Sequence, residues 1–171
     1  MKTAKQIATL AVMAALMVAA KWALNVVPNV ELVSLFAALF AYTFGFISII
    51  PITIFCTEEL ISWGFGSWAV AYYIYFNLIA IVFALLSRRK KESIVLPIIS
   101  ITILTTFFGI LTTAIDCLFT GLDNFFYKFS IIYARGIAFY IVHIISNIVI
   151  FSALFYPLKK LLLFFKEKIY K

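Results

Sequence analysis

The chain has 171 residues, of which 65% are hydrophobic and 12% charged, and its formal net charge is +7. A soluble domain is about half apolar and about one quarter charged, so this composition excludes an ordinary soluble fold and predicts an integral membrane protein. The basic residues gather at the ends of apolar stretches, which indicates membrane topology rather than nucleic-acid binding. We expect one all-α transmembrane domain over residues 1–171.

Three basic clusters predict the topology. Eleven of the fourteen Lys and Arg residues lie at positions 2–5, 88–91 and 159–171. The positive-inside rule places all three clusters in the cytoplasm, so the number of spans between consecutive clusters must be even. Residues 5–87 have room for four short spans and residues 93–157 for two. We therefore expect six transmembrane helices, with the N and C termini both cytoplasmic.

The first expected helix covers residues 5–24 and has a row of alanines. Ala11, Ala15 and Ala19 recur every four residues, which puts them on one face of a helix. Such a smooth row lets another helix approach closely, and that helix can belong to a partner subunit or to this chain. A cleavable signal peptide with basic residues 2–5 is the main alternative for this span, but the apolar run is long for one.

A short outer loop is expected over residues 25–31. Pro28 disfavours helix at the residue before it, and Asn29 is suited to cap the next helix, with Glu31 in its first turn. Capping alone explains both polar residues. The alternative is that the loop covers a cavity and offers an amide and a carboxylate to a ligand.

Residues 32–69 must hold two spans, which we place at 32–50 and 51–63. Gly45 and Pro51 favour an inner turn between them. The second span is shorter than the about 20 residues of a full crossing, which indicates a tilted or partial crossing.

The outer turn at residues 62–68 contains two glycines flanked by Trp63, Phe65 and Trp68. Aromatic side chains at a membrane boundary are usually interfacial anchors. The alternative is that they stack against a ring-shaped ligand.

The fourth and fifth spans, expected at 69–87 and 94–119, each contain polar groups. Tyr73 and Asn77 lie on the fourth span, and Asp116 ends a stripe of threonines and glycine on the fifth. Polar groups within apolar helices normally face another helix or a cavity rather than lipid.

The sixth span is expected to begin near residue 133, after an outer loop over residues 120–130. Tyr140, His143 and Asn147 follow at spacings of three and four, so they share one helix face. A lone intramembrane histidine with an asparagine one turn later is a candidate binding site, and hydrogen bonding between helices is the alternative.

The outer half of the protein is therefore expected to form a pocket that opens to the outside. The candidate substrate-binding residues are Asn29, Glu31, Trp63, Phe65, Trp68, Tyr73, Asn77, Asp116, Arg135, Tyr140, His143 and Asn147. The motifs G-x-x-x-x-G-K-[ST], H-E-x-x-H and G-x-S-x-G are absent from the sequence. We therefore expect no catalytic residue, no bound metal and no cofactor.

Together these features resemble a known family, the substrate-binding S components of energy-coupling factor (ECF) vitamin transporters. The resemblance lies in the six-span size, the alanine row, and the segments at residues 27–31, 63–66, 136–147 and 157–158. It covers nearly the whole chain, and the alanine row is the part most closely tied to mechanism.

The resemblance implies a multi-pass protein of a prokaryotic cell membrane that binds a vitamin or vitamin precursor from outside. Cobalamin is the first candidate, followed by pantothenate or a pyrimidine precursor. Ala11, Ala15 and Ala19 would dock on a transmembrane coupling subunit driven by two cytoplasmic ATPases, the protein would topple in the membrane, and loop 25–31 would act as a gate. The alternative is a membrane interaction or assembly subunit whose polar stripes only pack helices.

Overall fold

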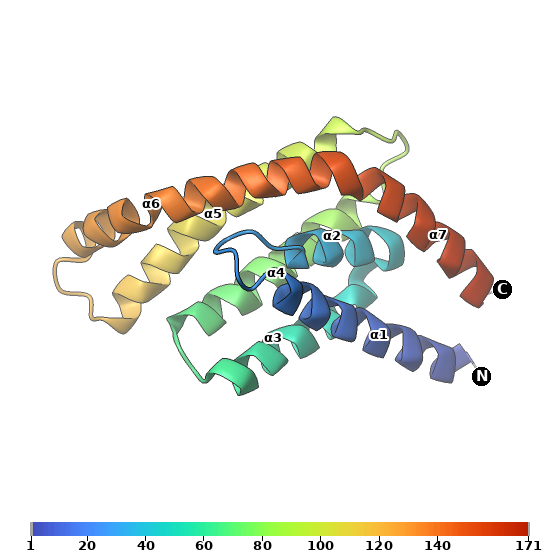
Figure 1. Cartoon of the computed structure of the whole chain (residues 1–171), viewed down its shortest axis with the longest axis horizontal. Coiled ribbons are helices and arrows are strands. Elements are labelled where there is room, and N and C mark those ends of the chain that lie inside the picture. Colours follow the sequence, from blue (N-terminus) through green and yellow to red (C-terminus); the bar gives the residue numbers. More distant parts are fainter. Residues whose placement is uncertain (1, 171) are drawn as a thin grey trace.

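The computed structural model describes residues 2–170, and in this range all the regular secondary structure is helical (Figure 1). This confirms the all-α prediction. The helices, with a 3₁₀ turn η1 and a π-helical turn η2, are α1 (Lys2–Ala23), α2 (Val33–Phe44), η1 (Gly45–Ser48), α3 (Ile49–Trp63), α4 (Ser67–Leu86), α5 (Val95–Phe119), α6 (Phe125–Ile150), η2 (Phe151–Phe155) and α7 (Tyr156–Tyr170).

Five helical segments of the described chain are long and apolar enough to cross a membrane. They are Ala4–Ala23, Val33–Trp63, Ser67–Leu86, Val95–Phe119 and Phe125–Ile169. A hydrocarbon core about 30 Å thick takes about 20 residues of helix, and each segment meets that length. The fold therefore has the helices expected of an integral membrane protein.

The segment Val33–Trp63 is interrupted at Gly45. This residue has φ of +73°, a backbone conformation that favours glycine, and it ends α2. After η1 the chain turns back, so that α2 and α3 run in different directions (Figure 1). Pro51 lies in the first turn of α3, where a missing N–H group removes no helical hydrogen bond. The turn expected at Gly45 and Pro51 is therefore present, although α3 begins at Ile49.

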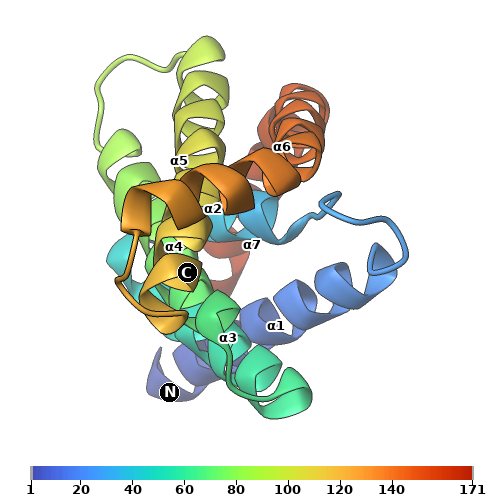
Figure 2. The ribbon, with the colours of Figure 1, turned by 90° about the vertical axis from the view of Figure 1, so that its left-hand side faces the viewer.

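The core is centred on α2 and α4. Figure 2 shows these two helices in the middle of the bundle, with α1 and α3 on one side and α5 and α6 on the other. Nine of the twelve residues of α2 are buried, whereas only two of the twenty-six residues of α6 are, His143 and Asn147. The largest fully buried side chains include Tyr75 and Phe83 of α4 and Phe40 of α2.

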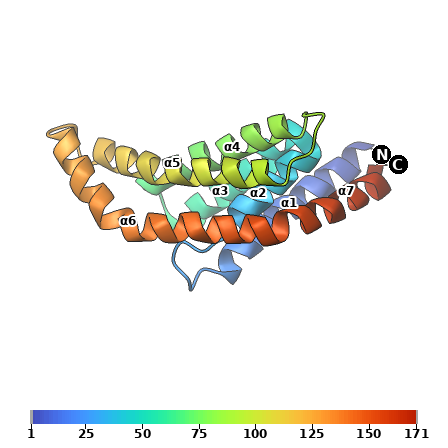
Figure 3. The ribbon, with the colours of Figure 1, turned by 90° about the horizontal axis from the view of Figure 1, so that it is seen from above.

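The helices α5 and α6 form a long antiparallel hairpin (Figure 3). The helix α6 begins at Phe125, so the prediction of an outer loop over residues 120–130 and a start near residue 133 was wrong. Aromatic side chains at helical spacing explain the longer helix. The ring of Phe129 lies 6.1 Å from that of Phe125 and stacks at 5.7 Å on that of Tyr133, so successive turns stabilise one another.

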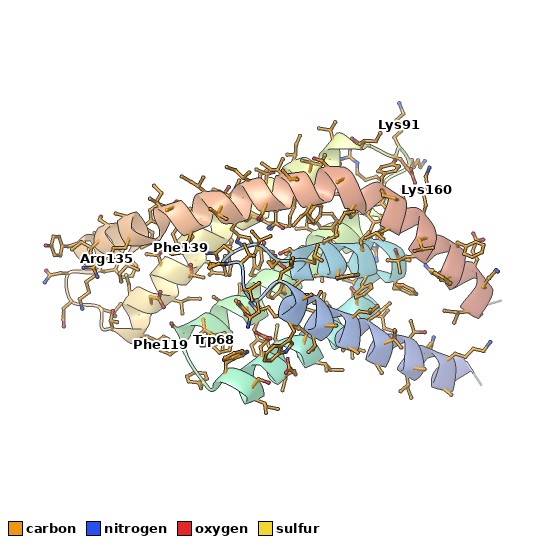
Figure 4. All side chains as sticks on the ribbon, viewed as in Figure 1. Trp68, Lys91, Phe119, Arg135, Phe139 and Lys160 are labelled. Carbon is orange, nitrogen blue, oxygen red and sulfur yellow. The ribbon has the colours of Figure 1, made fainter. Side chains whose placement is uncertain are left out.

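Both termini and the loop between α4 and α5 lie at one end of the molecule (Figure 1). Figure 4 places Lys91 and Lys160 at this end and Arg135 and Trp68 toward the other. The loop and the tail are joined by an ion pair, because Lys159 Nζ lies 2.8 Å from Glu92 Oε1. The three basic clusters of the sequence therefore lie toward one end of the molecule, whereas the loop between α1 and α2 lies nearer the middle, at the end of α1 away from the N-terminus (Figure 1).

Candidate functional site

A cavity of about 100 Å³ lies under the loop that joins α1 to α2. The loop forms one wall, and α1, α2, α4, α5 and α6 supply the others. Its lining residues are Lys21, Leu24, Asn25, Val27, Pro28, Asn29, Val30, Glu31, Val33, Tyr72, Tyr75, Phe76, Phe108 and His143. We call this cavity the loop pocket.

Glu31 connects the loop to two helices. Its Oε2 accepts a hydrogen bond from the backbone N–H of Ser34 at 2.8 Å, and its Oε1 lies 3.3 Å from Nε2 of His143 on α6. The first contact satisfies one of the free N–H groups at the start of α2. The second contact ties the loop to α6 across the pocket.

Asn29 was expected to cap α2, and this prediction was wrong. The helix begins at Val33, and the cap contact comes from Glu31 instead. Asn29 has φ of +59°, a left-handed conformation that asparagine tolerates better than most residues. Its carbonyl oxygen accepts a hydrogen bond from Ser146 Oγ at 3.2 Å, which is a second tie between the loop and α6.

The carboxylate of Glu31 is the negative group of the loop pocket. Burial, the largest single cause, raises the pKa of this carboxyl. The hydrogen bond and the charge of His143, together with the hydrogen bonds from Ser34, lower the pKa by more than burial raises it. The net pKa therefore lies below its ordinary value, and Glu31 is ionised at neutral pH.

A lysine faces the pocket from α1. Lys21 Nζ donates a hydrogen bond to the hydroxyl of Tyr72 at 3.2 Å. In the described part of the chain Lys21 forms no ion pair. The pocket therefore has a cation, Lys21, on the α1 side and a carboxylate, Glu31, on the loop. His143 contacts the carboxylate.

Aromatic rings form the remaining walls. The ring of Phe108 on α5 lies 4.5 Å from that of Tyr75 and 5.4 Å from the His143 imidazole, and the ring of Phe76 lies 5.2 Å from that of Tyr72. The Tyr75 hydroxyl is held by Ser34 Oγ at 3.1 Å and by Thr105 Oγ1 at 3.2 Å. These contacts fix the walls before any ligand binds.

Of the twelve candidate substrate-binding residues, the structure brings three to this pocket, Asn29, Glu31 and His143. Two others on the same face of α6 contact α5 instead. The Tyr140 hydroxyl lies 2.9 Å from Thr113 Oγ1, and Asn147 Nδ2 donates to Thr105 Oγ1 at 3.1 Å. These two residues join helices and do not line the loop pocket.

The aromatic candidates lie around the turn between α3 and α4. Trp63 is 55% exposed and stacks on Trp22 at 5.7 Å, and Phe65 is 74% exposed. Trp68 contacts Tyr72 edge to face at 5.4 Å, which places it behind a wall of the pocket. None of the three candidates lines the pocket.

The last four candidates also lie outside the pocket lining. Asp116 accepts a hydrogen bond from Ser67 Oγ, and the Tyr73 hydroxyl lies 2.7 Å from Thr57 Oγ1. Asn77 donates to the Tyr73 carbonyl oxygen one turn earlier, at 2.8 Å. Arg135 is exposed near the far end of the α5–α6 hairpin (Figure 4).

The alanine row lies on an open face of α1. Ala11, Ala15 and Ala19 are all exposed, whereas Met13 and Met17 of the same helix are buried. The part of the chain that the structure describes therefore leaves this face uncovered. A partner helix on it stays a prediction.

Sequence reasoning missed Lys21, Tyr72, Tyr75 and Phe108 as pocket residues. Lys21 interrupts the apolar run just before the loop, and this was the available signal. Tyr72 and Tyr75 are three residues apart and so share a helix face, but only the fold shows which face points at the loop.

Compared with known proteins, the chain matches no family model, no curated protein and no solved structure. The functional argument therefore depends on the geometry and chemistry of the site.

Proposed function

We propose that this protein is a substrate-binding S component of an ECF-type vitamin transporter, which captures a vitamin or vitamin precursor from outside the cell. The observation that supports it most directly is the position of the loop pocket, at the C-terminal end of α1 and away from the end of the molecule where the three basic clusters lie. If the basic end is cytoplasmic, as the positive-inside rule requires, the pocket opens outward.

The proposed topology has six crossings with both termini in the cytoplasm. The break at Gly45 divides Val33–Trp63 into two passes, α2 and α3, which adds one crossing to the five long apolar segments. These helices have 12 and 15 residues, fewer than the about 20 of a full crossing. The burial of nine of the twelve residues of α2 supports a short pass inside the bundle for that helix.

Loop 25–31 is the proposed gate. Two side chains of α6 hold it closed, since His143 contacts Glu31 and Ser146 contacts the Asn29 carbonyl oxygen. Two such contacts can break and re-form during substrate entry, because a net hydrogen bond stabilises by about 1 kcal/mol and one to a charged group by about 1.5–3 kcal/mol.

The energy for transport would come from elsewhere. The sequence has no P-loop motif, so the proposed partners are a transmembrane coupling subunit and two cytoplasmic ATPases. The exposed alanine face of α1 is the proposed docking surface, because small side chains allow two helices to approach closely.

A non-transport interaction or assembly subunit is the second candidate, and two observations favour it. Tyr140 and Asn147 are occupied by contacts with α5, as expected if polar stripes only join helices. The loop pocket is also smaller than the about 300–1,000 Å³ of common ligand pockets.

A thermal-shift screen of the detergent-purified protein against B vitamins and their precursors tests the proposal. A ligand that binds only the folded state raises the melting temperature by mass action. We expect one compound to do so at micromolar concentration. No shift with any compound would favour the assembly subunit.

A further inference from the structure

We infer that the loop pocket selects a compound with a single aromatic ring that has an acidic group and, elsewhere on the ring, a hydrogen-bond donor. This inference rests on the proposed function and names the substrate class of the same site. Three independent features of the pocket support it: its size, its two charged groups and its aromatic walls.

The size of the pocket limits the ligand to one ring. An apolar cavity of about 150 Å³ holds one benzene molecule. The loop pocket has about 100 Å³, less than that cavity, so it admits at most one six-membered ring, and only if the loop that forms one wall shifts outward. The corrin ring of cobalamin, the first candidate from the family resemblance, is much larger than this cavity.

The cation on α1 favours an acidic group. Lys21 has three N–H donors, and the Tyr72 hydroxyl accepts one of them. The other donors have no carboxylate partner in an ion pair within residues 2–170. A ligand carboxylate beside Lys21 would form a charge-assisted hydrogen bond, which is stronger than a neutral one.

The carboxylate of Glu31 favours a hydrogen-bond donor on the part of the ligand away from its acidic group. Ser34 and His143 each occupy one oxygen of Glu31, and a carboxylate oxygen can accept a second hydrogen bond. A ring N–H or an amino group is the matching ligand chemistry. An acidic group at this position would meet the negative charge of Glu31 and be repelled.

The aromatic walls favour a flat ring between these two groups. Tyr72 and Phe76 come from α4 and Phe108 from α5, and all three line the pocket. Rings stack offset or edge to face, and such a pair adds about 0.5–1.5 kcal/mol beyond the area it buries.

A matched set of small probes tests the inference on the purified full-length protein. The probes are the three pyridine monocarboxylates and the three aminobenzoates, each with its carboxamide, which keeps the ring and loses the negative charge. We expect at least one acid to bind and its amide to bind about tenfold or more weakly, the loss expected for one hydrogen bond to a charged group.

Three variants test whether Lys21 causes the preference for the acid over its amide. Lys21→Met keeps the length of the side chain and should remove the acid-over-amide preference, whereas Lys21→Arg should keep it. Lys128→Met is the matched control, because Lys128 lies at the outer end but bonds the carbonyl oxygens of Thr120 and Gly121 outside the pocket. It should leave the preference unchanged.

The outcomes separate this inference from the proposed function. Equal binding of acid and amide, or an acid preference that survives Lys21→Met, would overturn the inference. Binding of only neutral or multi-ring vitamins would overturn it while the proposed function stands. If neither these probes nor the vitamin panel bind, both fail. The wild-type comparison of acid with amide needs no variant, so a misfolded Lys21→Met protein does not prevent the test.

Discussion

Two hollows in this protein differ in both size and chemistry. The loop pocket has about 100 Å³ and contains charged groups, whereas a groove between α1, α2 and α7 has about 660 Å³. The groove lies toward the end that holds both termini, and its lining is almost entirely apolar. Its residues are Lys5, Ala8, Thr9, Val12, Met13, Leu16, Phe36, Leu39, Phe40, Phe44, Leu158, Leu161, Leu162, Phe165 and Ile169.

The comparison teaches that volume is a poor guide to a binding site in a membrane protein. Lipid chains are as apolar as leucine, so the bilayer fills an apolar groove at little cost. Burying a charged group within a helix bundle costs free energy unless the group is paired or hydrated. Such groups are therefore retained where they have a function. The chemistry therefore favours the smaller hollow, with Lys21, Glu31 and His143, as the substrate site.

The largest expected effect separates docking from binding. Ala15→Leu places a branched side chain on the alanine face beside the groove, which should abolish co-purification with a coupling subunit and leave ligand affinity unchanged. Ala138→Leu is the control, since Ala138 is another exposed helical alanine, on α6. Loss of ligand binding in Ala15→Leu would show that the row belongs to the internal packing.

The next effect concerns acid stability. The pKa of Glu31 is lower in the folded state than in the unfolded state. Its contribution to the free energy of unfolding is therefore present above the ordinary pKa of about 4.3 and is lost as the pH falls through the folded-state pKa. Glu31→Gln should lower stability at neutral pH by about 1–3 kcal/mol and flatten the fall of melting temperature below about pH 4.3.

Glu92→Gln is the matched control for this acid effect. The hydrogen bonds of Lys159 and Tyr156 and the charge of Lys159 also lower the pKa of Glu92, but its side chain is 61% exposed. Because Glu92 is exposed, water screens this ion pair although Lys159 is buried, and a screened pair contributes about 0–1 kcal/mol, so the acid profile should change less than in Glu31→Gln. Equal changes in the two melting profiles would show that Glu31 has no special role in closing the loop.

A smaller effect distinguishes the pocket from the contact between α5 and α6. Tyr140→Phe removes a hydrogen bond to Thr113, which should reduce stability by about 0.5–1.5 kcal/mol. Ligand affinity should not change, because Tyr140 does not line the pocket. A loss of affinity measured by calorimetry, with an unchanged melting temperature, would extend the site along α6.

The class of fold was predictable because it follows from composition and from helix length. The turn at Gly45 was also predictable, since local residue chemistry requires it. The start of α6 was not, because it depends on rings of Phe125, Phe129 and Tyr133 that stabilise a helix where a polar loop was expected.

The site was only partly predictable for a similar reason. Glu31 and His143 are 112 positions apart, and polarity alone identified both as candidates. The same signal also selected Tyr140, Asn147 and Asp116, each of which forms a hydrogen bond between helices instead. Sequence periodicity gives the face of a helix but not the neighbour of that face, which only packing decides.

The most direct test of the central claim is the affinity of the strongest panel compound for two variants, measured by titration calorimetry. His143→Ala changes the loop pocket, and Leu161→Ala changes the groove. The account predicts at least about a tenfold loss of affinity for His143→Ala, the size expected for a contact with a charged group, and no change for Leu161→Ala. Unchanged affinity in His143→Ala together with a loss in Leu161→Ala would contradict it.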